Sequence, residues 1–398
     1  MKINGMESRN ILSALVANLY HKAVDPNFNL PLNIKVVSSA EVAKVIFLEP
    51  DIFVKNYGFI EGFAQGRFSA SGEDWRLRSK ITQSFYSQAT VVLDGAATEA
   101  IYSKHLKAYL ASGQKNLFDT FINAALEVVS MAFALPKPIP WPLSLVHRAR
   151  AALTDQQAMA WVGSSPELAA QSQHELDQIF AEFALLWKHD PAIKNLLNQF
   201  SAQAVGVKNF NAVGELLQNV FASTETTASG LLWAVECMTR HAHLPVVAMP
   251  EDHAADRVYF LDEVLRVFSP VPYVSRVCTK ATKIQGMEFA EHEAIVVSLI
   301  GVHSDPQHWH EPLMFKPRRD EFVNGSFARH AYIPFISGPR VCAGMKLAKQ
   351  EIQCGVQALL KLFVVKPCTE PRGLEYGLAS RPSIDLAPYL VPRLKKEQ

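Results

Sequence analysis

The N-terminal part of the sequence lacks an apolar run long enough to cross a membrane. Its best candidate, residues 11–20, is interrupted by Ser13 and Asn18, whereas a membrane-spanning helix needs about 20 apolar residues. No small-residue cleavage motif follows the run, which makes a signal peptide a poor explanation. We therefore expect an ordinary first helix here, in a protein without a membrane anchor.

Cysteine and net charge are also scarce. Only five cysteines occur and none form a C-x-x-C pair, which argues against a zinc ribbon or a disulfide framework and suits the reducing cytoplasm. The 39 Lys and Arg residues balance 38 Asp and Glu residues to a net charge of +1, so nothing indicates a nucleic-acid partner. Apolar residues, in contrast, make up 49% of the 398 positions. This is ample for a sizeable core, in one large domain or in two to three smaller ones.

The most informative stretch is residues 335–344. Its glycines and proline predict a tight loop, and apolar residues at three- and four-residue steps from Met345 to Phe363 predict a buried helix after it. Cys342 therefore precedes a helix N-terminus, where the helix dipole favours an anion, and Arg340 adds a positive charge. A lone cysteine is more commonly a small buried hydrophobe, but here we expect a readily ionised sulfur that is a metal ligand or a nucleophile.

The same stretch resembles the haem-binding signature of the cytochrome P450 superfamily. The signature F-x-x-G-x-R-x-C-x-G is filled at every fixed position, by Phe335, Gly338, Arg340, Cys342 and Gly344. The resemblance implies a haem b cofactor (iron protoporphyrin IX) with the Cys342 thiolate as the iron ligand. It also implies that Phe335 packs beside the sulfur, that Gly344 belongs to the cofactor loop, and that Arg340 neutralises a haem propionate.

Residues 211–241 predict one long helix with an unusual polar centre at 222–227. A turn between two helices is the alternative, but no Gly or Pro occurs from Leu216 to Ser229. The centre is similar to the oxygen-activation motif of the central cytochrome P450 helix. The resemblance implies that Thr226 and Glu225 relay protons and that Ala222, on the face of Thr226, borders the haem. Ser223 stands where the family usually has glycine.

Two further arginines are expected at the haem propionates. In the helix that opens at Glu73, the family places an arginine that binds a propionate, and anchoring the pattern on Arg78 and Phe85 selects Arg78. This alignment puts Asp74, and not Trp75, at the family's aromatic position; a solvated basic face with one anchoring tryptophan is the alternative. The resemblance also implies that Arg276, in a strand after residue 270, is a second propionate ligand.

Glu263 and Arg266 form an E-x-x-R pattern that, taken alone, describes a surface ion pair worth about 0.3–0.5 kcal/mol. The resemblance implies instead a buried cluster completed by Arg319, with Arg318 standing where the family usually has an acid. His303, His308 and His310 do not follow a standard metal-ligand spacing, so we interpret them as loop histidines.

The expected fold is mainly α with small β-sheets, as in the helical prism of the cytochrome P450 haem-thiolate fold. Residues 1–398 are expected to form a single catalytic domain, whose β-rich part covers about residues 30–60, 270–330 and 365–395. Alternate prolines at 136–142 predict a stiff loop within that domain. The last strands, over 374–390, are expected to pair as a closing hairpin.

The function that the resemblance implies is that of a soluble monooxygenase of bacterial type. It would insert one oxygen atom of O2 into a hydrophobic small-molecule substrate. Electrons would come from a ferredoxin and a ferredoxin reductase, because the sequence has no flavin or iron–sulfur motif. A basic patch of Lys80, Arg329, Lys346 and Lys349 would suit an acidic ferredoxin, although ordinary surface charge explains these residues too. We expect a cytoplasmic monomer.

Two other functions remain open from the sequence. A haem-thiolate peroxygenase or isomerase would need no redox partner, although Thr226 argues for dioxygen reduction. A non-catalytic haem sensor or carrier would use the pocket for binding alone.

Overall fold

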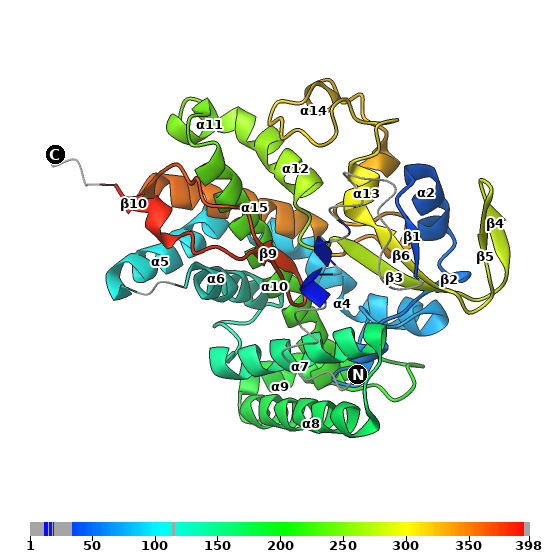
Figure 1. Cartoon of the computed structure of the whole chain (residues 1–398). Coiled ribbons are helices and arrows are strands. Elements are labelled where there is room, and N and C mark those ends of the chain that lie inside the picture. The colour runs from blue at the N-terminus through cyan, green and yellow to red at the C-terminus, as the bar shows by residue number, and fades with distance from the viewer. Residues whose placement is uncertain (1–11, 15, 18, 20–33, 114–115, 394–398) are drawn as a thin grey trace.

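The computed structural model describes residues 12–14, 16, 17, 19, 34–113 and 116–393. Helices dominate the chain, as expected, and the mainly α fold class is confirmed (Figure 1). The α-helices are α2 (Ala40–Leu48), α3 (Gly58–Glu61), α4 (Gly72–Val92), α5 (Gly95–Ser112), α6 (Leu117–Ala132), α7 (Leu143–Val162), α8 (Pro166–Lys188), α9 (Pro191–Gln203), α10 (Ala212–Arg240), α11 (Pro245–Ala248), α12 (Arg257–Val267), α13 (Leu299–His303), α14 (Asp320–Val323) and α15 (Met345–Leu362). Short 3-10 turns are η1 (Ala254–Asp256), η2 (Arg329–Ala331), η3 (Gly338–Arg340) and η4 (Ala387–Tyr389).

The strands form one small sheet and three two-stranded pairs. They are β1 (Lys35–Val37), β2 (Phe53–Lys55), β3 (Tyr273–Cys278), β4 (Thr282–Ile284), β5 (Met287–Phe289), β6 (Ala294–Ser298), β7 (Phe363–Val365), β8 (Leu374–Tyr376), β9 (Ser380–Pro382) and β10 (Leu390–Pro392). The sheet order is β1-β6-β3-β2, with β1 parallel to β6. The closing hairpin was only partly predicted: β8 pairs with β9, whereas β10 pairs with β7 and so fastens the end of α15.

The long helix α10 runs through the core and packs against α6 and α15 (Figure 1). Its start is capped by the Asn211 side chain. The polar centre does not interrupt it, so the prediction of one continuous helix is confirmed and a turn is excluded. The hydroxyl groups of Thr224 and Thr226 donate to the carbonyls of Val220 and Ala222, one helical turn earlier, at 2.9 and 2.8 Å.

Polar side chains of α10 also fix the loop between α3 and α4. Gln218 donates from Nε2 to the Ala64 carbonyl at 2.6 Å and accepts from the Phe68 N–H at 3.1 Å. Glu215 accepts from the Arg67 N–H at 3.0 Å. Because both side chains are buried, these bonds hold the loop firmly over the middle of the molecule.

The predicted buried cluster of Glu263, Arg266 and Arg319 is present. Both guanidinium groups donate two hydrogen bonds to the Glu263 carboxylate, at 2.8 Å from Arg266 and at 3.0 and 3.1 Å from Arg319. The three side chains are 0–1% exposed. Arg318 points outward to Asp256. The cluster therefore joins α12 to the segment before α14 in a fixed position.

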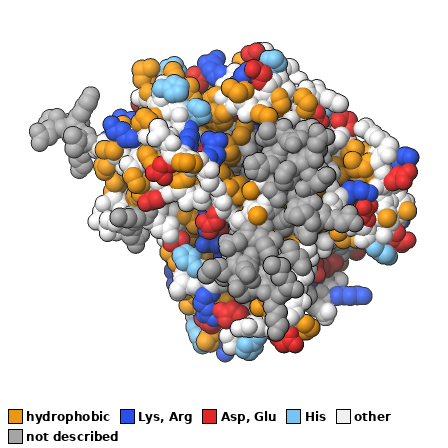
Figure 2. All heavy atoms as spheres, viewed as in Figure 1, with side chains coloured by type: hydrophobic (Ala, Val, Ile, Leu, Met, Phe, Trp, Pro, Cys, Tyr) orange, Lys and Arg blue, Asp and Glu red, His pale blue; other side chains and the backbone are white. Residues whose placement is uncertain are grey.

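The predicted first helix falls partly outside the described residues. Of its described part, Leu12, Val16 and Leu19 are buried and pack in a cluster with Tyr273 and Tyr376. Among the described residues, no helix is long and apolar enough to span a bilayer. On the face drawn in Figure 2, basic and acidic side chains are interspersed among the described atoms.

Candidate functional site

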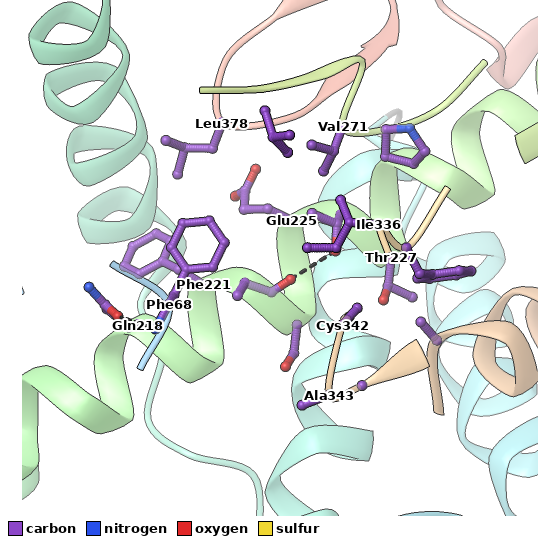
Figure 3. Close-up of a pocket in the computed structure, with 18 of the residues that line it drawn as sticks. Phe68, Gln218, Phe221, Glu225, Thr227, Val271, Ile336, Cys342, Ala343 and Leu378 are labelled. Atoms are coloured by element: carbon purple, nitrogen blue, oxygen red, sulfur yellow. Dashed lines mark hydrogen bonds between the residues drawn. The ribbon is translucent and has the colours of Figure 1, made fainter. Parts of the chain in front are cut away.

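A largely apolar cavity lies between α10 and the loop that carries Cys342. Its walls come from segments far apart in the sequence: β2 and the loop after it, α4, α10, β3, residues 334–344, the first turns of α15, and the segment around β8. Figure 3 shows Cys342 and Ala343 on one side of this space and Val271 and Leu378 on the opposite side. Phe221 and Glu225 of α10 lie between them.

One face of α10 borders the cavity. Ala222 is exposed and Thr226 is partly exposed, although their neighbours Phe221, Glu225 and Thr227 are buried. Both Ala222 and Thr226 line the cavity, so the structure brings together the pair that the sequence placed on one face. Since the Thr226 hydroxyl donates to the Ala222 carbonyl, its oxygen is left able to accept a hydrogen bond from the cavity.

The Cys342 loop is held by its backbone. The Cys342 N–H donates to the Phe335 carbonyl at 3.0 Å. Gly338 has φ of 71°, and a Cβ there would lie 2.3 Å from the Phe47 carbonyl oxygen, so only glycine lets the loop approach α2 this closely. Phe335, Cys342 and Gly344 all line the cavity.

Cys342 was expected to ionise readily, but its surroundings in the structure favour the neutral thiol. The side chain is exposed only in the sense that it faces the cavity, and surrounding protein raises the pKa of the Cys342 thiol by desolvation. The Gly344 N–H, Arg67 and Lys55 lower the pKa but do not outweigh burial. A metal cation bound at this sulfur would favour the thiolate directly and so oppose the desolvation.

Basic side chains crowd one part of the cavity wall. Lys55, Arg67, Arg276 and Arg340 all line it. Burial and the neighbouring Arg276 lower the pKa of Arg340 to about 9, and burial with the nearby arginines lowers the pKa of Lys55 well below its usual value. The buried Arg276 Nη2 has no hydrogen-bond partner among the described residues. This concentration of positive charge fits a dianionic ligand such as the two haem propionates.

Arg78 is placed elsewhere, which corrects the prediction that it contacts a propionate. Its guanidinium contacts Asp74 at 2.9 Å and Glu215 at 3.5 Å, and within the described chain it does not line the cavity. The prediction assigned the wrong side of α4 to the cavity. Trp75 lies on the cavity side of α4, with its ring 4.4 Å from the Arg340 guanidinium carbon, while Arg78 faces the start of α10.

Arg67, Lys55 and Arg150 are site residues that the sequence did not reveal. Arg67 lines the cavity, where Arg78 was expected, and its Nη1 donates to the Ser79 carbonyl at 3.3 Å. In the sequence, each of them is only a basic residue that belongs to no motif: Arg67 in a loop, Lys55 in a strand and Arg150 in a helix. Folding alone brings Arg67 and Lys55 to the cavity, and brings Arg150 to Glu225 at its border.

Glu225 is bound by Arg150 from α7. The guanidinium donates to both carboxylate oxygens at 2.7–3.0 Å, and both side chains are largely buried. The Arg150 guanidinium carbon also lies 4.8 Å from the centre of the Phe118 ring. Glu225 borders the cavity as expected, but in the form of an ion pair.

The comparisons with known proteins agree on one family. Residues 259–378 match the family model for cytochrome P450. Cytochrome P450 3A16 of Mus musculus is 31% identical over 194 residues, covering 44% of this chain and 38% of that protein. Cytochrome P450 3A28 of Bos taurus is 32% identical over 168 residues, covering 38% of this chain and 33% of that protein. The match thus spans well under half the length of these relatives.

The solved structure of the haem domain of a cytochrome P450DA mutant superposes with a TM-score of 0.76 at 18% identity, covering 97% of this chain and 95% of that one. This likeness confirms the fold. The lining of the cavity fits a haem, since it combines the Cys342 thiol, an apolar wall and a cluster of cations. Residues 259–378 are thus similar in sequence to cytochrome P450, and the chain has the cytochrome P450 fold.

Proposed function

We propose that this protein is a monooxygenase that inserts one oxygen atom of O2 into a hydrophobic small molecule. The observation that carries the proposal is the position of Thr226 and Ala222 on the cavity wall contributed by α10, in a cavity also bordered by Cys342. A thiolate-ligated haem supplies dioxygen activation and oxygen-atom transfer when bound. The chain supplies the axial sulfur, the charge that holds the cofactor, the proton path and the substrate pocket.

For cofactor binding, Cys342 would be the iron ligand, and Arg276 and Arg340 would pair with the propionates. Lys55 and Arg67 join them because they line the same wall. Phe335 and Gly344 border the cavity beside Cys342, where Phe335 would limit solvation of the sulfur. The unpaired Arg276 Nη2 gains a hydrogen-bond partner once a carboxylate is bound.

For proton delivery, we assign Thr226 and Glu225. The Thr226 oxygen can accept a hydrogen bond from a polar hydrogen in the cavity while its own O–H donates to the Ala222 carbonyl. Glu225 borders the same cavity, but its oxygens are occupied by Arg150. Transfer of a proton through Glu225 therefore requires the Arg150 ion pair to open, and Arg150 becomes a positioning residue for this step.

The substrate pocket is apolar with one polar corner. Phe68, Phe221, Val271 and Leu378 give it apolar walls (Figure 3). At the corner, the Gln157 side chain donates to the Tyr273 hydroxyl at 3.0 Å and lies 3.4 Å from the Tyr376 hydroxyl. Its Oε1 has no partner among the described residues. These groups would bind a hydroxyl group on an otherwise hydrophobic substrate.

Ferredoxin remains the electron donor that we propose, with a ferredoxin reductase. Lys80, Arg329 and Lys346 are exposed on α4, η2 and the first turn of α15, the elements that flank the Cys342 loop. Lys349 already pairs with Asp262 at 3.2 Å, which makes it a weaker member of the patch. Reversing the charge of Lys346 should slow reduction by ferredoxin, whereas Lys283→Glu on the β4–β5 pair serves as a control; equal rates would remove this assignment.

We further propose that the chain acts as one catalytic domain over residues 1–398, as a cytoplasmic monomer. The walls of the cavity come from residues as distant as Lys55 and Leu378. A site assembled from such distant parts of the sequence needs them to fold together.

The test compares Cys342→Ser, Thr226→Val and Thr224→Val with the unchanged protein. The reduced protein with carbon monoxide should show the strongly red-shifted absorbance of thiolate ligation, and Cys342→Ser should lose it. With a substrate found by ligand-induced shifts of the haem spectrum, Thr226→Val should lower product formed per NAD(P)H by about 10²-fold, the usual size of a general acid–base contribution. Thr224→Val removes a hydroxyl bonded to Val220 and should change neither readout.

Other results would redirect the assignment. Turnover with peroxide but not with ferredoxin and NAD(P)H would favour a peroxygenase. An intact haem spectrum with no oxidation across a broad apolar library would favour a sensor or carrier. An unchanged spectrum in Cys342→Ser would overturn haem-thiolate chemistry altogether.

A further inference from the structure

Two histidines and a glutamate meet at a place separate from the cavity lining. Glu41 lies in the first turn of α2, His308 in the loop after α13, and His330 in η2. The Glu41 Oε1 is 2.7 Å from the His308 Nε2 and 3.2 Å from the His330 Nε2. All three potential ligand atoms lie within 4.8 Å of one another.

The kinds of donor and their spacing match a zinc site. Zinc takes imidazole nitrogens and carboxylate oxygens at about 2.0–2.2 Å, so neighbouring ligand atoms around it are about 3.3 Å apart. The two separations between the carboxylate oxygen and the imidazole nitrogens, 2.7 and 3.2 Å, are close to this spacing. The side chains are 31%, 15% and 26% exposed for Glu41, His308 and His330, so water can reach the fourth position.

The ligands are carried by segments that already pack together. Ser39 caps α2. Its hydroxyl lies 3.4 Å from the Glu41 Oε2, whereas both histidines contact the other carboxylate oxygen, Oε1. The His308 N–H donates to the Asp305 carbonyl at 3.0 Å. The 3-10 turn η2 packs against α2. Such support lowers the entropic cost of gathering three ligands.

We propose that Glu41, His308 and His330 form a binding site for a divalent transition metal of the zinc class. The metal would replace the two hydrogen bonds that Glu41 Oε1 now accepts, and each histidine would present its Nε2 lone pair with its proton on Nδ1. It would fasten α2 to η2, which leads directly into the Cys342 loop. The site is structural in kind and does not depend on the proposed oxidation chemistry.

Zinc titration of the haem-loaded, chelator-treated protein tests the proposal. Calorimetry should show one Zn2+ bound per chain, and a melting temperature that rises with added Zn2+. His308→Ala, His330→Ala and Glu41→Gln should each weaken binding at least tenfold, as expected when a ligand is lost. His310→Ala is the matched control, because His310 lies in the same loop with its side chain 83% exposed.

Several outcomes would overturn the site. Zinc binding equal to the unchanged protein in His308→Ala, or binding lost equally in His310→Ala, would place the metal elsewhere. Absence of saturable binding below millimolar Zn2+ in the unchanged protein would show that the three side chains form only a hydrogen-bonded group. The haem spectrum and the melting temperature in chelator confirm that each variant is folded before its affinity is compared.

Discussion

The buried Glu351 gives the sharpest prediction about stability. It lies on α15, is 2% exposed, and accepts a hydrogen bond from the Tyr102 hydroxyl at 2.9 Å. Burial raises the pKa of Glu351 to about 8, against the opposing effect of the Tyr102 hydrogen bond. In the folded protein the side chain is therefore neutral at pH 7.

The pH dependence follows from comparing folded and unfolded chains. The unfolded chain releases this proton near the ordinary pKa of 4.5, whereas the folded chain keeps it until about pH 8. Because a raised folded-state pKa favours folding only while the proton is bound, stability falls as the pH rises through that window. At about 1.36 kcal/mol per tenfold difference in proton affinity, the full loss is about 5 kcal/mol at most.

The substitution Glu351→Gln removes this proton exchange while keeping the shape of the side chain and an acceptor for Tyr102. Urea unfolding of the haem-loaded protein between pH 5 and pH 8.5 should show a smaller decline in the variant. The variant should be the more stable protein at pH 8.5 and nearly equal at pH 5. Glu288→Gln, at a side chain 78% exposed, should follow the unchanged protein; parallel curves for Glu351→Gln and the unchanged protein would refute the reasoning.

The remaining predictions concern buried ion pairs. Arg150→Met leaves the buried Glu225 carboxylate without its partner and should cost about 3–5 kcal/mol in urea unfolding; the double variant with Glu225→Gln should recover most of the loss, and equal stability of single and double variants would contradict the pairing. Glu263→Gln leaves Arg266 and Arg319 sharing a neutral amide and should cost about 3–5 kcal/mol. Arg318→Met, at a side chain 62% exposed, should stay within about 0.5 kcal/mol in the same assay, and a similar loss in both would argue against the buried cluster.

Local patterns predicted the elements of this fold well. The apolar period after Cys342 is realised as α15, and the uninterrupted run from Asn211 as α10. Such periodicity reflects burial of one helix face, which is a property of neighbouring residues in the chain. Likewise, the E-x-x-R pattern placed Glu263 and Arg266 correctly, because residues three apart on a helix share a side.

Predictions failed where the result depends on a second segment. Arg78 was expected at the cavity, but the phase of α4 turns it toward Glu215 and places Trp75 on the cavity side. The Cys342 thiol was expected to ionise because of its helix, but desolvation by the surrounding protein dominates its pKa. His308 does lie in a loop, as expected, but nothing near it in sequence points to its contact with Glu41.

The sequence by itself determined the secondary structure of the central helices, the cysteine loop and the family resemblance, because these depend on the spacing of residues that are close along the chain. The tertiary structure alone decided which cations border the cavity, that Arg150 binds Glu225, and that Glu41 meets His308 and His330. Those outcomes depend on distance and burial between separate segments of the chain, and electrostatic interactions change steeply with both.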